Sequence, residues 1–196
     1  MLSYKDSLKV LKKTRALLEG HFVLSSGLHS NKYIQCSKLL SFPNNASKIC
    51  NSLSKKILKA FPLVDLILSP ALGGIIIGYE IGRQLNTETI FCERVGGEFK
   101  LRRGFSIKKN AKVLIIEDVI TTGKSSLECA KLVKKSKAKI LGFACIIDRS
   151  DKENLLIKNN KIVSQIKISV SAYKKNDLPS FLKKMPIITP GSRFLK

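Results

Sequence analysis

The sequence predicts an α/β fold with a Rossmann-like parallel β-sheet and helices on both faces. Continuous apolar runs at 64–69, 112–118 and 139–148 are typical of strands buried on both sides of such a sheet. Segments of helical character follow the first two runs, and this alternation implies right-handed crossovers. The chain has 196 residues and is 44% hydrophobic, which suits one domain with a sizeable core and is too short for two ordinary domains.

Residues 1–60 are predicted to form a small subdomain beside the sheet. Its first element is expected to be a helix over 3–19 that stops at Gly20. The stretch 21–40 has the pattern of a short β segment, a glycine turn and a second β segment. A helix over 43–60 should complete the subdomain, because Phe61-Pro62 ends its pattern.

The core is expected over 61–170 and a C-terminal helix and tail over 171–196, all within the single domain 1–196. The remaining expected elements are, in order, strand 64–69, helix 73–85, strand 87–93, exposed loop 95–104, strand 112–118, helix 123–136, strand 139–148 and strand 162–170. Asp177 is expected to cap a short last helix, and the tail after Met185 to be irregular.

Charge and composition leave several partners open. The chain carries 36 Lys and Arg against 14 Asp and Glu, a net charge of +22. Such an excess suits anionic partners, but these residues occur along the whole chain, so a solvated lysine-rich surface explains it equally. Five cysteines without a C-x-x-C pair, and an N-terminus without a signal-peptide pattern, predict reduced thiols in the cytoplasm. The most apolar stretch, 64–82, contains charges and Pro70, so no membrane association is expected.

The stretch VLIIEDVITTGKSS (113–126) carries the chemistry. Its two acids end a buried strand, at the sheet edge where α/β proteins bind ligands. TTGKSS then leads into a helix, whose N-terminus offers free N–H groups to a phosphate, with hydroxyls from Thr121, Thr122, Ser125 and Ser126 as further donors. Carboxylates accept hydrogen bonds from a sugar diol, so the pattern predicts a ribose 5-phosphate site. A P-loop is absent, because its first glycine would stand at Asp118.

IIEDVITTGKSS resembles the phosphoribosyl-diphosphate (PRPP) motif of type I phosphoribosyltransferases. Four further stretches extend the resemblance to the orotate phosphoribosyltransferase family in its short bacterial form, over about residues 8–150. They are ALLEGHFVLSSGLHSNKYIQ (16–35), SPALGGI (69–75), FCERVGGEFKLRRGF (91–105) and IIDRS (146–150).

The resemblance implies a type I phosphoribosyltransferase fold with a small N-terminal subdomain that covers the base. It implies transfer of ribose 5-phosphate from PRPP to orotate, a pentosyl transfer of de novo pyrimidine (UMP) biosynthesis that yields orotidine 5′-monophosphate and diphosphate. The cofactor would be Mg²⁺, held by PRPP and water rather than directly by the protein. The enzyme would be a cytoplasmic homodimer with PRPP and orotate as its ligands and no nucleic acid or membrane partner.

By the same resemblance, the PRPP motif supplies most of the donor site. Glu117 and Asp118 would hold the ribose hydroxyls and favour the cationic transition state. Thr121 would also face orotate. The residues implied to bind PRPP are Glu117, Asp118, Val119, Ile120, Thr121, Thr122, Gly123, Lys124 and Ser125, together with Ala71, Leu72 and Gly73 in a diphosphate-binding turn.

The remaining implied residues lie outside the motif. Arg94, Lys100, Arg102 and Arg103 belong to a loop, 94–104, that would close over the diphosphate, with Arg94 the first choice for a direct contact. Arg149 would grip the orotate carboxylate, and Ser26, Gly27 and Tyr33 would help to cover the base. Longer members carry lysine where Ser25 and Gly73 stand; Gly73 fits the short form, whereas Ser25 removes a cation beside the substrate.

Other interpretations stay open. A phosphoribosyltransferase for another base, such as a purine, would keep the PRPP motif, and so would a PRPP-sensing regulator that binds nucleic acid. Locally, residues 71–73 could be an ordinary strand–helix turn and 94–104 a solvated charged hairpin. Arg149 could form a surface ion pair with Asp148 or Asp151, and Tyr33 could serve in packing only.

Overall fold

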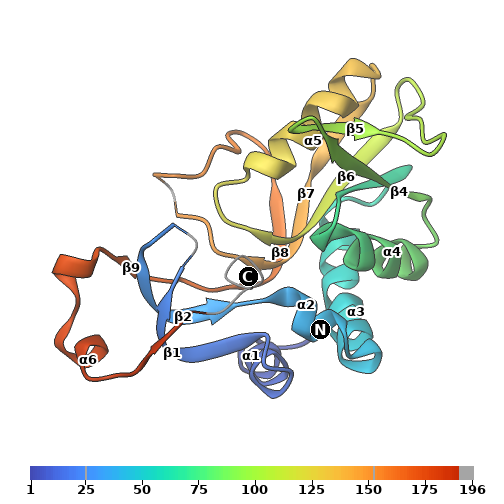
Figure 1. Cartoon of the computed structure of the whole chain (residues 1–196). Helices are drawn as coiled ribbons and strands as arrows, with labels where there is room; N and C mark the ends of the chain where they lie inside the picture. The colour runs from blue at the N-terminus through green and yellow to red at the C-terminus, as the bar shows by residue number, and fades with distance from the viewer. Residues whose placement is uncertain (25, 152, 190–196) are drawn as a thin grey trace.

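A computed structural model describes residues 1–24, 26–151 and 153–189. The chain forms two β-sheets (Figure 1). The larger has the order β5-β4-β3-β6-β7-β8, and the smaller has the order β10-β1-β2-β9. The strands of the larger sheet are β3 (Leu66–Pro70), β4 (Thr89–Val95), β5 (Glu98–Leu101), β6 (Lys112–Ile120), β7 (Lys139–Asp148) and β8 (Ile162–Lys167).

The connectivity of the larger sheet places a ligand site between β3 and β6. Five of its strands are parallel, and only β5 runs antiparallel, on the edge beside β4. From β3 the chain moves outward to β4, then returns past β3 to continue with β6, β7 and β8. This reversal is a topological switch point, which is where open α/β sheets bind their ligands.

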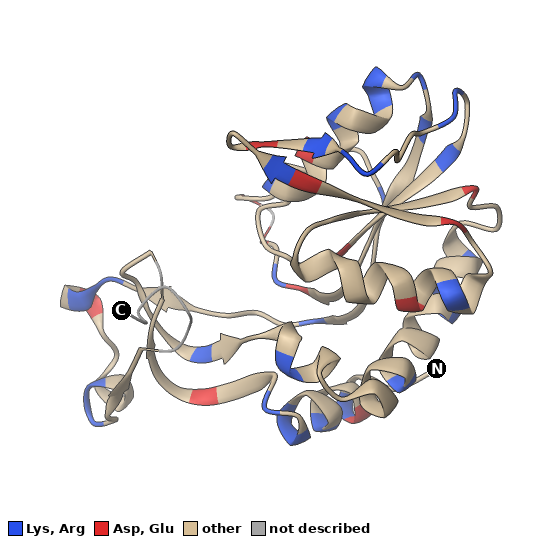
Figure 2. Ribbon diagram, turned by 45° about the vertical axis from the view of Figure 1, so that its right-hand side comes forward, with Lys and Arg blue, Asp and Glu red and all other residues tan. Residues whose placement is uncertain are grey.

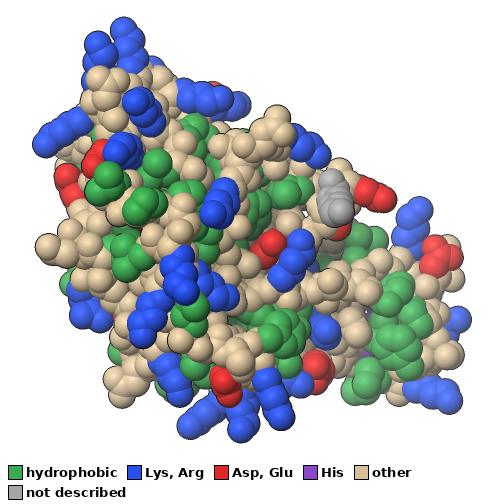
Figure 3. All heavy atoms as spheres, turned by 180° about the vertical axis from the view of Figure 1, so that it is seen from behind, with side chains coloured by type: hydrophobic (Ala, Val, Ile, Leu, Met, Phe, Trp, Pro, Cys, Tyr) green, Lys and Arg blue, Asp and Glu red, His purple; other side chains and the backbone are tan. Residues whose placement is uncertain are grey.

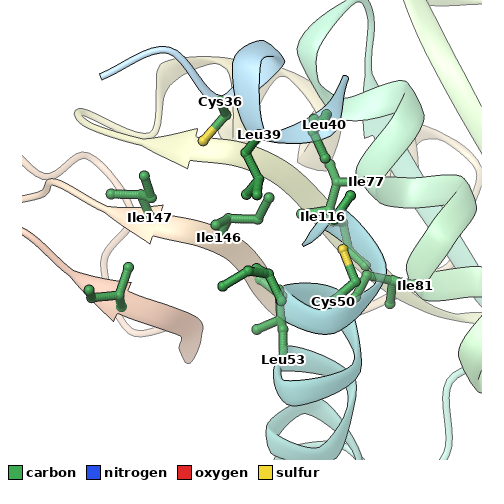
Figure 4. Close-up of a cluster of buried hydrophobic side chains, with 14 of the residues drawn as sticks. Cys36, Leu39, Leu40, Cys50, Leu53, Ile77, Ile81, Ile116, Ile146 and Ile147 are labelled. Atoms are coloured by element: carbon green, nitrogen blue, oxygen red, sulfur yellow. The ribbon is translucent and has the colours of Figure 1, made fainter. Parts of the chain in front are cut away.

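Helices cover both faces of this sheet, as predicted. One face packs against α2 (Cys36–Leu40), α3 (Pro43–Ala60) and α4 (Gly73–Leu85), and α1 (Tyr4–Lys13) lies beside α3. Figure 4 shows side chains from α2, α3 and α4 meeting Ile116 and Ile146 of the sheet. The other face packs against α5 (Lys124–Lys135) through a second apolar cluster. The α/β fold class is therefore confirmed, and the helix over 73–85 and the strand over 139–148 have their predicted bounds.

The first helix is shorter than predicted. It ends at Lys13, and Leu17–Val23 forms strand β1, so Gly20 lies inside a strand rather than after a helix. Leu18, which fitted the helical spacing, pairs with Tyr33 of β2 (His29–Ile34). Leucine spacing alone did not reveal this boundary, because the pairing partner lies elsewhere in the chain. Helix α2 was also missed; at five residues it is too short to show a period.

The segment 95–104 is a β-hairpin with a short loop after it, which corrects the prediction of a loop throughout. Strand β4 continues to Val95, Gly96 and Gly97 turn with positive φ angles of 60° and 84°, and β5 pairs back along β4. The pattern of β5 alternates, since Phe99 is buried whereas Glu98 and Lys100 are exposed. Its high cation content concealed this period-2 signal.

The smaller sheet joins the two ends of the chain. Strand β9 (Ala172–Tyr173) pairs with β2, and β10 (Ile187–Ile188) pairs in parallel with β1. The tail after Met185 thus forms a strand before the described chain ends. Asp177 lies in a 3₁₀ turn, and Pro179 occupies the N-cap position of α6 (Ser180–Lys183). The division at residues 60 and 170 stays a prediction, but this sheet draws on both outer segments.

Basic residues are dispersed over the molecule. Figure 2 shows Lys and Arg on helices, strands and loops around both sheets. The face in Figure 3 carries them interspersed with apolar and acidic side chains. No helix in the described part of the chain is both long and apolar enough to span a membrane.

Candidate active site

The two adjacent acids lie at the end of β6, beside the switch point. Successive side chains of a strand point to opposite faces, and these two do so. Glu117 turns toward α5, where its Oε2 accepts a 2.6 Å hydrogen bond from Ser126 Oγ. Asp118 turns toward the N-terminus of α4, where a Cβ added to Gly73 would lie only 2.9 Å from its Oδ1. One acid therefore borders each of the two turns that leave β3 and β6.

Burial governs the ionisation of both carboxyl groups. Burial raises the pKa of Glu117, while the hydrogen bond from Ser126 opposes this rise. Burial also raises the pKa of Asp118, and the hydrogen bond from the Val119 N–H, 2.9 Å from Oδ1, opposes it. The site thus holds two poorly solvated carboxyl groups, whose charged forms are favoured by nearby hydrogen-bond donors.

The turn between β6 and α5 surrounds a small pocket. The pocket has a volume of about 150 Å³ and is lined by Glu117, Val119, Thr121, Thr122, Gly123, Lys124 and Ser125. Helix α5 begins at Lys124 without a side-chain hydrogen bond at its N-cap, Gly123. The Lys124 N–H donates to Thr122 Oγ1 at 3.4 Å. The helix dipole at this end still favours an anion, whose binding here stays a prediction.

Gly123 is required by its conformation and by its neighbours. Its φ angle is +75°, and an added Cβ would lie 2.7 Å from the side chain of Ile157. The Leu156 N–H also donates to the Thr122 carbonyl at 2.8 Å. The segment after β7 thus packs against the turn and fixes its shape, a contribution that the sequence pattern did not indicate.

The turn after β3 lies on the other side of the switch point from the β6–α5 turn. The Ala71 N–H donates to the Cys92 carbonyl at 2.8 Å, and the Ala71–Leu72 peptide is cis. Leu72 is 85% exposed, and Gly73 begins α4 against Asp118. The turn thus lies against Asp118, and its predicted role in binding diphosphate stays a prediction.

Of the four cations in this segment, two lie against acidic side chains and two do not. Arg94 lies 2.7 Å from Glu128 Oε2 on α5, without hydrogen-bond alignment, and its guanidinium stacks 4.2 Å from the Phe99 ring centre. Arg103 forms a two-bond ion pair with Glu93, at 2.9 and 3.1 Å. Lys100 and Arg102 are exposed and form no ion pair within the described residues. Arg94, the first choice from the sequence, is thus paired in this structure, and its contact with a diphosphate stays a prediction.

Arg149 follows β7 at the same edge of the sheet. Its backbone N–H donates to the Ile120 carbonyl at 2.8 Å. Its Nε is buried and has no hydrogen-bond partner in the described part of the chain, and burial lowers the pKa of the guanidinium. Asp148 instead lies near Lys167 and Asp151 bonds to Asn154, so the alternative of an ion pair with either acid finds no support among the described residues.

The predicted base-covering residues belong to the β1–β2 hairpin. Tyr33 is half-buried and lies 5.7 Å from Phe22, ring centre to ring centre. Ser26 and Gly27 form the turn, where Gly27 has a φ angle of 79°. Ser25 lies outside the described residues. These residues thus belong to the smaller sheet, whereas the two acids lie on β6 of the larger sheet. Their contact with a base stays a prediction.

Two neighbours of the site were not selected from the sequence for these roles. Ser126 was expected to face a phosphate but bonds to Glu117, and Cys36 approaches the Asp118 carbonyl with Sγ at 3.8 Å. Neither has a motif of its own, although the helical period of α5 puts Ser126 on the same face as the buried Cys129 and Val133. The described residues contain no group of three or more His, Cys, Asp or Glu that could hold a metal ion.

A parallel sheet with two acids at its switch point and a helix N-terminus beside them is the arrangement that the sequence predicted for a phosphoribosyltransferase. A model of the phosphoribosyl transferase domain matches residues 41–178, and the chain belongs to that family. The orotate phosphoribosyltransferase of Phenylobacterium zucineum (strain HLK1) is 43% identical over 195 residues, 100% of both chains. The resemblance to orotate phosphoribosyltransferases is therefore confirmed.

Solved structures agree on the fold. The orotate phosphoribosyltransferase of Aeropyrum pernix matches with a TM-score of 0.66 at 22% identity, covering 82% of this chain and 92% of that one. The Francisella tularensis protein of the same name matches at 0.64 and 22%, covering 85% and 84%. Adenine phosphoribosyltransferase from Thermoanaerobacter pseudethanolicus matches at 0.60 and 19%, covering 70% and 88%. At these identities the likeness concerns the fold alone.

Proposed function

We propose that the chain transfers ribose 5-phosphate from PRPP to N1 of orotate, releasing diphosphate and forming orotidine 5′-monophosphate for pyrimidine nucleotide synthesis. The observation that carries this proposal is the β6–α5 junction, where two poorly solvated carboxyl groups adjoin a helix N-terminus whose N-cap, Gly123, makes no side-chain bond. The full-length relationship to an orotate phosphoribosyltransferase supports the choice of base.

The ribose 5-phosphate would lie along this junction. The pocket at Thr121–Ser125 would take the 5′-phosphate through N–H groups and hydroxyls. Asp118 and Glu117 would accept hydrogen bonds from the ribose hydroxyls, and their charge would favour the oxocarbenium-like transition state. Bond cleavage at C1 then requires positioning and electrostatic stabilisation, without a covalent protein nucleophile.

The diphosphate would leave between the turn at 71–73 and the hairpin. Backbone N–H groups of the turn would bind its oxygens, and the hairpin cations would close over it to exclude water. Mg²⁺ would be held mainly by diphosphate, ribose oxygens and water, because it keeps several waters and needs few protein ligands. When bound, Mg²⁺ would neutralise charge on the leaving group.

Orotate would be held by its carboxylate. Arg149 has a buried Nε without a partner among the described residues, and a guanidinium can bind a carboxylate through two parallel hydrogen bonds. Its position after β7, bonded through its backbone to Ile120, sets it beside the PRPP motif. Thr121 and the β1–β2 hairpin, including Ser26, Gly27 and Tyr33, would complete the base site.

We further infer a homodimer in the cytoplasm. Helix α4 exposes the apolar side chains of Ile76 and Tyr79 next to Leu72, all more than half exposed, and a second copy could cover this surface. Five free cysteines, all buried, suit a reducing compartment. Sedimentation analysis tests the dimer, and a monomer at assay concentration would contradict it.

The test of the reaction is a base panel. The protein is mixed with PRPP and Mg²⁺ and with orotate, uracil, adenine or hypoxanthine in separate reactions, and loss of each base is followed. We expect only orotate to be consumed, with one diphosphate released per nucleotide. Consumption of a purine instead would move the chain to the other-base interpretation, and PRPP binding without turnover of any base would favour a regulator.

A further inference from the structure

Ser126 is a buried polar residue that none of the proposed ligand contacts uses. It lies in the first turn of α5, with a side chain that is fully excluded from solvent. The pocket at the β6–α5 turn is lined by residues up to Ser125 and does not include it. Its hydroxyl instead donates to Glu117 Oε2 at 2.6 Å, across the gap between α5 and β6.

Glu117 needs such a donor because its surroundings disfavour its charge. Burial is the largest effect that raises its pKa, and negative charge on Asp118 and Glu128 adds to it. Arg94 lies against Glu128 and offsets part of that charge. The titratable and charged groups that face Glu117 are Asp118 on its own strand, Glu128 and Cys129 on α5, Cys145 on β7, and Arg94 beside Glu128.

The protonation state of Glu117 decides what it can offer to a sugar. A carboxylate accepts hydrogen bonds through both oxygens, whereas a carboxylic acid has lost part of that capacity. Only the charged form also stabilises positive charge on the ribose. The direction of the side chain matters equally, because Glu117 has three side-chain torsions and a donor on α5 restricts them.

We infer that Ser126 is a positioning residue for the proposed reaction: its hydroxyl fixes Glu117 at the edge of the PRPP pocket and keeps its carboxylate ready to bind the ribose. The inference rests on the proposed function, since it assigns Glu117 to the ribose of PRPP. It adds a residue that does not itself touch substrate. Ser126 lies on the face of β6 that is covered by α5, away from solvent.

Ser126→Ala tests this role. Alanine is smaller and favours helix, so the variant should fold. A hydrogen bond to a charged group is worth enough that its loss should reduce kcat/KM for PRPP about tenfold. Because Glu117 would hold its proton to higher pH, the acid limb of the pH profile should move upward, and the deficit should grow as pH falls.

Two comparisons separate positioning from general packing. Ser54→Ala removes another buried helical hydroxyl, one without a partner among the described residues, and should leave the kinetics unchanged. Glu117→Gln should itself lower kcat/KM, and Ser126→Ala added to Glu117→Gln should lower it little further, because the hydroxyl acts through that carboxylate. Thermal unfolding of each variant confirms that the native fold is present.

The outcomes distinguish this inference from the proposed function. No turnover of orotate by the wild type would overturn the function itself. Turnover by the wild type with an unchanged rate and pH profile for Ser126→Ala would overturn only the role of Ser126. Equal losses from Ser126→Ala in the wild-type and Glu117→Gln backgrounds would also overturn it, since the hydroxyl would then act independently of Glu117.

Discussion

The β6–α5 junction and the β4–β5 hairpin carry most of the charged residues proposed to bind PRPP. The side chains of the junction are already arranged for a ligand, whereas those of the hairpin are engaged with other residues of the chain. At the junction, Glu117 and Asp118 each accept a hydrogen bond that favours the charged form, and the turn is fixed by the segment after β7. In the hairpin, Arg94 and Arg103 are paired with acids of the same chain.

This difference separates a preformed part of the site from a part that must exchange contacts. A ligand can enter the junction without breaking any ion pair there. For Arg94 to reach a diphosphate, it must leave Glu128 and the Phe99 ring, and Arg103 must leave Glu93. Variants at the junction should therefore act directly on the reaction, whereas those in the hairpin should act through its closure.

The largest effect is expected at the junction. Asp118→Asn should reduce kcat/KM by well over tenfold, because a neutral amide neither attracts a ribosyl cation nor accepts hydrogen bonds through both terminal atoms. Steady-state kinetics with PRPP varied measures this. Asp65→Asn, at the opposite edge of the sheet, is the matched control and should be close to wild type. Full activity of Asp118→Asn would refute the ribose assignment.

A selective effect is expected at Arg149. Arg149→Ala should raise KM for orotate at least tenfold while changing KM for PRPP much less, because it removes a charge-assisted carboxylate contact and leaves the junction intact. Kinetics with each substrate varied in turn separates the two constants. Equal increases in both constants would instead indicate a general disturbance and reject the role of Arg149.

The β4–β5 hairpin is expected to become less accessible to protease when PRPP binds. Trypsin cleavage after Lys100 or Arg102, both exposed, should slow several-fold when PRPP and Mg²⁺ are added, because closure protects the backbone. Mass spectrometry of the first fragments locates the cuts. Cleavage after the exposed Lys109, outside the hairpin, serves as the internal control and should change little. If all three sites responded alike, closure of the hairpin would not explain the protection.

The same contrast explains what the sequence could predict. The strand, turn and helix of 112–135 are contiguous, so periodicity and the order of acid, glycine and hydroxyl residues indicated both the fold and the site. The hairpin, the smaller sheet and the N-terminal helix end depend on partners far away in the chain. Leu18 pairs with Tyr33, and His21 with Ile187, a pairing that local patterns do not contain.

Side-chain direction was the other limit. Adjacent acids suggested two equivalent ligands for a diol, but pleating sends Glu117 toward α5 and Asp118 toward α4. Likewise, a run of cations gave no means to distinguish Arg94, which stacks on Phe99, from Lys100, which is exposed and has no ion pair in the described chain. Tertiary packing decides the direction of each side chain, and the sequence pattern alone does not contain it.

The smallest expected effect concerns stability. The substitution Asp118→Asn, which should lower the activity, should raise the free energy of unfolding. Burial raises the folded-state pKa of Asp118 above its unfolded value, so the folded chain binds this proton more tightly. The group's contribution is therefore most favourable below the unfolded pKa and is lost as pH rises through the folded pKa. At pH 7 the wild type buries a charge that Asp118→Asn does not, and the variant should be more stable by about 1 kcal/mol.

Urea unfolding of both proteins, at steps from pH 7 down to pH 4.5, measures this difference. The advantage of Asp118→Asn should shrink as pH falls, because the wild-type carboxyl takes up its proton. The amide oxygen that Asp118→Asn introduces can still accept the hydrogen bond from the Val119 N–H, so that contact does not bias the comparison. A variant that is less stable at pH 7, or an advantage that does not vary with pH, would show that Asp118 is not held as a costly charge for the sake of the reaction.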